Sequence, residues 1–121
     1  MPDPKAPAGL RAAGQALWRD VLRGVPAGWE LDERESALLA LAAQQADDLA
    51  RLDDAIRGHG AMVEGSQGQP VVNPAISEAR NARLAISRLL GALAIPNESG
   101  HAGTEASRRG QRAARARWGH S

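Results

Sequence analysis

Apolar residues recur at steps of three and four along three segments of the chain, residues 9–23, 32–57 and 74–94. Such steps place side chains on one face of a helix, so the pattern predicts three amphipathic helices. The second segment has near-heptad spacing, which is typical of a narrow, coiled-coil-like seam. The positions expected to be buried are Leu10, Ala13, Leu17, Trp18 and Val21 in the first helix, Leu38, Ala42, Leu49, Leu52 and Ile56 in the second, and Ile76, Ala79, Ala82, Ile86, Leu89, Leu90 and Leu93 in the third.

A segment with a different pattern, GHGAMVEGSQGQPVVNP at residues 58–74, separates the second and third helices. Its Met62-Val63 and Val71-Val72 pairs favour extended backbone and flank a Gly-Ser-Gln-Gly centre. This arrangement predicts a β-hairpin over residues 60–72, closed by a short glycine turn. The expected fold class is mainly α, with three helices and a β-hairpin between the second and the third.

Local signals predict where the second and third helices begin and end. Asp32 and Glu35 have the spacing of a capping box, which starts the second helix. Asn73 can accept a hydrogen bond from an early helical N–H, and Pro74 suits the first position of the third helix. Pro96 ends that helix, because proline disfavours helical backbone in the residue before it.

With 121 residues, the chain is expected to form one domain with two tails. We expect a disordered arm at residues 1–8, a helical oligomerisation core at residues 9–96 and a basic, flexible tail at residues 97–121. Three tryptophans are the only aromatic residues, so the core has little bulk and favours burial against further copies of the chain. The candidate oligomer-core residues are Leu17, Trp18, Leu38, Leu49, Leu52, Ile56, Ile86 and Leu90.

Composition and motifs argue against several classes of site. The chain has no cysteine, which excludes a disulfide framework and a cysteine zinc site. No apolar run approaches about 18 residues, so we expect no membrane partner. His59, His101 and His120 lack the spacing of a metal pair, and neither a phosphate-binding loop nor a nucleophile elbow is present. We therefore expect no enzyme activity, no metal and no cofactor.

The net charge of the chain is +1, but the charged residues are unevenly distributed along the sequence. Residues 1–95 carry ten basic and twelve acidic side chains, whereas residues 96–121 carry five arginines and two glutamates. A basic tail of this kind binds DNA phosphates, docks on an acidic protein surface, or only aids solubility. Trp118 can stack on a base or anchor in a partner groove. The candidate DNA-binding or partner-docking residues are Arg108, Arg109, Arg112, Arg115, Arg117 and Trp118.

Three arginines of the third helix have two interpretations. Arg80, Arg83 and Arg88 share one half of the helix, so in a ring of subunits they can face nucleic acid, which makes them weak DNA-binding candidates. If the second and third helices are antiparallel, the same arginines pass a row of acids, and pairing with that row is the favoured interpretation. The acids of the row are Asp47, Asp48, Asp53 and Asp54.

The order of these features resembles the small subunit of phage terminases, in particular the branch with a GxxLW start and an NPA helix restart. The resemblance covers about residues 9–96. The motifs that carry it are GQALWR at 14–19, the long helix after Leu31-Asp32, the hairpin at 60–72, NPA at 73–75 and LGALAIP at 90–96.

The resemblance implies a non-catalytic factor of viral DNA packaging. Small terminase subunits assemble into rings, engage double-stranded viral DNA, and recruit and regulate the large subunit that holds the ATPase and nuclease. The location implied is the host cytoplasm during phage infection. The second helix is an unsuitable recognition helix for DNA, since seven acids and three arginines lie between Asp32 and Arg57.

Two other classes of function fit the same sequence. A small oligomeric transcriptional regulator or antitoxin would bind an operator through the basic terminus. A structural adaptor of the virus particle would bind protein and no DNA. A ring-sized mass in solution favours the terminase interpretation, whereas a stable dimer favours the regulator.

Overall fold

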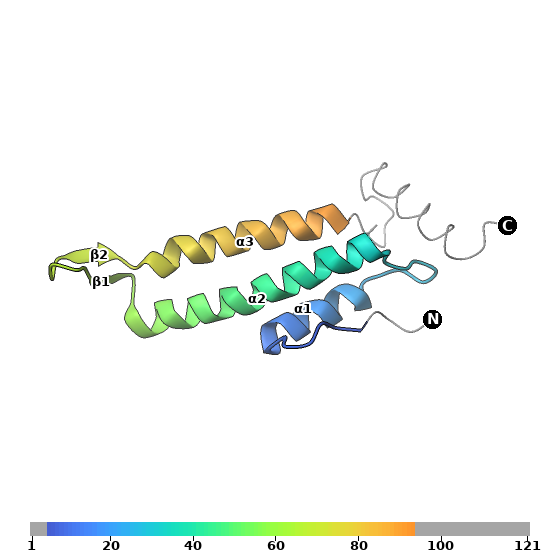
Figure 1. Ribbon diagram of the computed structural model, residues 1–121, viewed down its shortest axis with the longest axis horizontal. Helices are drawn as coiled ribbons and strands as arrows, with labels where there is room; N and C mark the ends of the chain where they lie inside the picture. The colour runs from blue at the N-terminus through green and yellow to red at the C-terminus, as the bar shows by residue number, and fades with distance from the viewer. Residues whose placement is uncertain (1–4, 94–121) are drawn as a thin grey trace.

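The structure, a computed structural model, describes residues 5–93 (Figure 1). Its elements follow the order α1 (Ala12–Arg23), α2 (Glu33–His59), β1 (Met62–Glu64), β2 (Pro70–Val72) and α3 (Pro74–Leu93). The long helices α2 and α3 run antiparallel, α1 lies against α2, and the two strands extend beyond the helices at one end (Figure 1). The predicted mainly α fold, with a β-hairpin between the second and third helices, is confirmed.

The β-hairpin closes as the glycine-rich centre predicts. The backbone N–H of Gly65 donates to the carbonyl of Gln69 at 2.6 Å, and Gly68 has a φ of +80°. A left-handed φ of this kind is easy for glycine, which explains its place in the turn. The strands pair antiparallel in the register Met62–Val72, Val63–Val71 and Glu64–Pro70.

The capping box predicted for the second helix is present at the start of α2. Asp32 Oδ1 accepts the backbone N–H of Glu35 at 2.7 Å, and Glu35 Oε1 accepts the N–H of Asp32 at 2.9 Å. α2 then continues to His59. The next residue, Gly60, has a φ of +84°, which lets the chain leave the helix and enter the hairpin.

The core lies where α2 is covered on two sides, by α1 and by α3. A helix with two neighbouring helices buries side chains over a wider part of its surface than the narrow seam that the near-heptad spacing predicted. The predicted width of the buried face of α2 was therefore wrong. Leu39 and Ala43 were not in the predicted seam and are fully buried, whereas Leu49 and Leu52 were in it and are half-buried. The residues of the core cluster are Leu10, Trp18, Leu31, Leu39, Ala43 and Leu93.

α1 begins at Ala12, later than the predicted start at Gly9. Gly9 has a φ of +87°, which is outside the helical region. α3 begins at Pro74 as predicted, and its predicted end at residue 94 lies outside the described residues. Among the helices of residues 5–93, none has an apolar stretch of the length that a bilayer span requires.

Candidate functional site

The contact between α1 and α2 is built around Asp47. Its carboxylate accepts the backbone N–H of Arg11 through Oδ2 at 2.7 Å and that of Gly14 through Oδ1 at 2.7 Å. Both N–H groups belong to the first turn of α1, where a helix has no internal acceptors for them. The N-cap residue Arg11 makes no capping bond with its own side chain. A carboxylate of α2 therefore caps α1 and fixes where it begins.

Gly14 lets α1 approach α2 closely. It is buried, and a Cβ atom at this position would lie 2.6 Å from the carbonyl oxygen of Ala43 and 2.6 Å from Oδ2 of Asp47. Trp18, one turn further along the same face, is 6% exposed and belongs to the core. The GxxLW motif is therefore a packing motif that seats α1 on α2.

Asn73 forms hydrogen bonds that connect the two ends of the β-hairpin. Its Oδ1 accepts the backbone N–H of Ala75 at 3.0 Å, which is the predicted N-cap of α3. Its Nδ2 donates to the carbonyl of Gly60 at 2.9 Å, and its backbone N–H donates to the carbonyl of Ala61 at 2.8 Å. Because Asn73 is only 6% exposed, these bonds form largely out of water. The NPA motif therefore fixes the angle at which the hairpin leaves the helices.

The predicted charge pairing between α2 and α3 forms at one position. Arg83 donates to Asp53 Oδ1 at 2.9 Å, with both side chains partly exposed. Asp54 pairs instead with Arg57 of its own helix. Asp47 is used by α1, so it takes no part in the row that was expected to face α3.

The other two arginines of α3, Arg80 and Arg88, have guanidinium groups that form no ion pair with the described residues. Arg80 and Arg88 are exposed, and within residues 5–93 neither forms a salt bridge or a side-chain hydrogen bond. The interpretation of the arginines as partners of the acidic row therefore applies to Arg83 only. Arg80 and Arg88 are left available for a partner.

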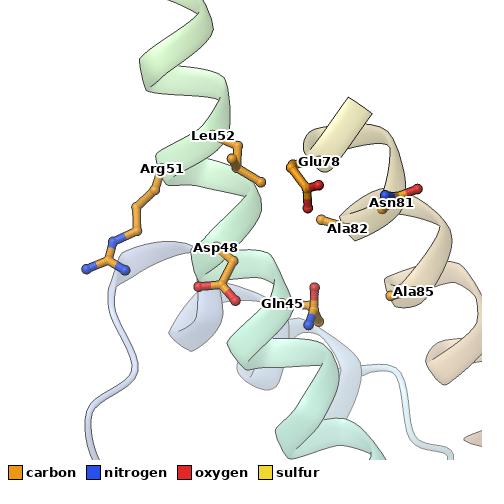
Figure 2. A pocket seen from close by; sticks show the side chains of 8 residues that line it. All are labelled: Gln45, Asp48, Arg51, Leu52, Glu78, Asn81, Ala82 and Ala85. Carbon is orange, nitrogen blue, oxygen red and sulfur yellow. The ribbon is translucent and has the colours of Figure 1, made fainter. Parts of the chain in front are cut away.

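An open groove of about 600 Å³ lies between α2 and α3. Figure 2 shows Asp48 of α2 and Glu78 of α3 beside this groove, with Arg51 pointing away from α3. Two carboxylates and no facing cation make the groove a poor site for a phosphate. Within residues 5–93, no three acidic or histidine side chains lie close enough to share a metal ion. The lining residues are Gln45, Asp48, Arg51, Leu52, Glu78, Asn81, Ala82 and Ala85.

The residues predicted to form the oligomer core are distributed unevenly between the interior and the surface. Of the eight, Trp18 is buried, and the other seven are partly exposed. Leu38 and Leu90 pack against the edge of the core cluster. The six tail candidates, Arg108, Arg109, Arg112, Arg115, Arg117 and Trp118, lie outside the described residues.

Sequence reasoning missed the role of Asp47, although a signal for it is present. Gly14 interrupts a helix whose apolar face it shares with Trp18 four residues later. A glycine on the buried face of a helix often marks a close backbone approach rather than a weak point. The residue that approaches is 33 positions away in the sequence, so local spacing does not identify it.

Residues 14–99 match the model of a protein family described as "Phage terminase, small subunit". Among curated proteins and solved structures, none matches the chain significantly.

Proposed function

Because the chain belongs to the family of phage terminase small subunits, we propose that it is a non-catalytic factor of viral DNA packaging. In this role it assembles into a ring, engages double-stranded viral DNA, and recruits or regulates the large subunit that carries the ATPase and nuclease. It acts in the host cytoplasm during infection. The observation that carries the proposal is the extent of the family match, which spans nearly all of α1 and the whole of α2, the hairpin and α3.

The distribution of apolar side chains supports self-assembly. Several large apolar side chains remain about half exposed in the single chain, namely Leu41, Met62, Val72 and Leu84. They lie on α2, on both strands and on α3, so apolar surface is left open along most of the fold. Burial of such surface against further copies is the usual way in which a small chain completes its core.

The helix connections in residues 5–93 argue against a helix-turn-helix. A helix-turn-helix joins its two helices by a turn of about 3–4 residues. Here α1 and α2 are joined by residues 24–32, and α2 and α3 by the hairpin. We therefore propose that DNA is engaged through phosphate contacts, with the basic tail at 97–121 as the segment that binds either DNA or the large subunit.

The hairpin is unsuited to DNA. Residues 61–72 carry Glu64 as their one charged side chain, and Met62 and Val72 are exposed on it. Apolar exposure without a cation favours contact with protein over contact with a polyanion.

Mass in solution together with DNA binding tests the proposal. Light scattering on the full chain should give a mass several times the 12.7 kDa of one chain. Electrophoretic mobility shifts at low salt should show binding to double-stranded DNA that weakens as salt rises. A stable dimer that binds one operator sequence would contradict the proposal and favour a regulator. An assembled protein without DNA affinity would favour a structural adaptor.

A further inference from the structure

The groove between α2 and α3 and the end of the chain have opposite charges. We propose that residues 115–118, with the sequence Arg-Ala-Arg-Trp, dock in the α2–α3 groove of their own chain. Docking places the guanidinium groups of this segment on protein carboxylates until DNA competes for them. The docking itself is independent of the proposed function, whereas its release by DNA rests on that function.

The groove has an apolar floor because the side chains on its α3 side are small. Ala82 is buried and Ala85 is partly buried, so neither fills the space between the helices. Leu52 of α2 lines the same groove and is only half-buried, and Figure 2 shows its side chain on the side of α2 that faces Ala82. An open groove of about 600 Å³ with such a floor has room for an aromatic side chain.

Two carboxylates border this floor, one from each helix. Asp48 on α2 and Glu78 on α3 are exposed, and within residues 5–93 neither forms a salt bridge. Figure 2 shows them on opposite sides of the groove. A cationic segment that lies between them meets a carboxylate on either side, which favours an arginine-containing occupant.

The cations of the two helices leave the groove acidic. Arg51 is the one basic residue among the lining residues, and it points away from α3 (Figure 2). Arg83 is paired with Asp53. Arg88 lies one turn beyond Ala85, the last lining residue of α3. The basic residues of α2 and α3 that do not line the groove are Arg34, Arg57, His59, Arg80, Arg83 and Arg88.

The end of the chain carries the complementary groups close together. Residues 106–121 hold five arginines and no acid, and Trp118 is the one large apolar residue of the tail at 97–121. Arg115 and Arg117 come three positions and one position before it. Tryptophan and arginine are the side chains that most often anchor protein interfaces. Trp118 is therefore the residue assigned to the apolar floor, and the two arginines are assigned to the carboxylates.

The chain is long enough for this segment to reach its own groove. At a rise of about 1.5 Å per residue, Ala82 lies about 16 Å from Leu93 along α3. The connecting residues, 94–114, span up to about 70 Å when fully extended. Because the segment and the groove belong to one chain, their effective concentration is high. Docking within the chain is therefore favoured over docking on another copy.

Crosslinking in the absence of DNA tests the docking. The chain has no cysteine, so two introduced cysteines are its only thiols. Asn81→Cys with Ala116→Cys places one thiol in the groove lining and one in the docked segment, and a short bismaleimide should link them within one chain. Adding Asp48→Asn and Glu78→Gln should lower the crosslinking rate by up to about thirtyfold, the upper range for the loss of two exposed ion pairs.

A second cysteine pair is the matched control. Ser87→Cys with Ala116→Cys uses an exposed residue of α3 that lies two positions past Ala85, about 200° further around the helix. This pair should link far more slowly than the pair with Asn81→Cys. Denaturing electrophoresis separates links within one chain from links between two chains, and circular dichroism reports whether each variant keeps its helices.

DNA affinity tests the release. Asp48→Asn with Glu78→Gln frees the segment, so DNA should bind this variant more tightly than the control variant Glu33→Gln with Glu64→Gln. Both variants remove two negative charges, and the two control glutamates are exposed, lie outside the groove and form no salt bridge within residues 5–93. The difference between the variants should disappear when residues 104–121 are deleted from both.

The other outcomes distinguish failure of the docking from failure of the proposed function. Equal crosslinking rates for the Asn81→Cys and Ser87→Cys pairs would overturn the docking. Links between two chains in place of links within one would overturn docking within the chain. If the link forms within the chain and DNA does not bind, the docking stands and the proposed function fails. If DNA binds the groove variant and the control variant equally well, the release by DNA is wrong.

Discussion

The carboxylate of Asp47 in α2 accepts the backbone N–H of Gly14 in α1 at 2.7 Å. A helix start carries unpaired N–H groups and a partial positive charge, so a carboxylate there stabilises the helix by both effects. The approach is possible because Gly14 has no side chain in the space that Asp47 and Ala43 occupy. α1 therefore depends on α2 for its first turn as well as for the burial of Trp18.

Removing this cap should weaken the attachment of α1. We expect Asp47→Ala to lower the free energy of unfolding by about 1–2 kcal/mol, the usual cost of losing an N-cap acceptor. The measurement is chemical denaturation followed by circular dichroism, with hydrogen exchange to locate the change in α1. Asp54→Ala, which removes an exposed carboxylate paired with Arg57, is the control and should cost at most about 0.5 kcal/mol. Equal losses in the two variants would refute the capping role.

Two glycines in helices should respond oppositely to alanine. Alanine is a better helix former than glycine by about 1 kcal/mol. At Gly91, where a Cβ would meet no atom within 4 Å, Gly91→Ala should stabilise the protein by about 0.5–1 kcal/mol. At Gly14, where a Cβ would lie 2.6 Å from a backbone oxygen, overpacking should outweigh that gain, and Gly14→Ala should destabilise by about 1–3 kcal/mol. Thermal melting of both variants checks the opposite signs.

The helix ends that the sequence predicted correctly depend on residues close together in the chain. The capping box at Asp32 and Glu35 and the N-cap at Asn73 each form between residues two or three positions apart. Local spacing alone predicts such bonds. The hairpin was predictable for the same reason, because its turn lies inside the segment.

The features that the sequence did not predict depend on which helices meet. The burial of Leu39 and Ala43 follows from the packing of α1 and α3 on two sides of α2. The spacing of apolar residues within α2 does not by itself show that two helices pack against it. The acidic row was split in the same way, because Asp47 faces α1 while Asp53 faces α3. Asp47 and Asp53 are six positions apart, which at about 100° per residue places them about 120° apart around α2, so the two acids serve different partners. The arginines of the tail remain a prediction.

Loss of the Asn73 side chain should loosen the hairpin more than the helices. Asn73→Ala removes the bonds to Gly60 and Ala75 from a buried site, and we expect a loss of about 1–3 kcal/mol in the free energy of unfolding. Amide exchange in residues 61–72 should accelerate most. Asn81→Ala is the control, since Asn81 is an exposed residue within α3, and it should change stability by less than about 0.5 kcal/mol. Unchanged exchange in the hairpin would show that Asn73 does not fix it.

Deletion of residues 104–121 should separate assembly from DNA binding. The deleted segment carries five arginines, whereas the described helices supply the proposed subunit contacts. We expect the truncated protein to keep its assembled mass while its DNA affinity and the salt dependence of that affinity fall. The measurement is fluorescence anisotropy of labelled DNA across a salt series.

A charge-conserving variant controls for the length of the tail. Replacing the five tail arginines by lysine should preserve most of the salt dependence, whereas replacing them by glutamine should remove it. A truncated protein with an unchanged salt slope would exclude the tail from DNA binding and favour its docking on the large subunit.

The ATPase rate of the cognate large subunit, measured on DNA with and without this protein, tests the central claim most directly. A terminase small subunit that regulates the motor should change that rate in a saturable manner. A rate that stays the same at every concentration of assembled protein would contradict the assignment to the packaging motor.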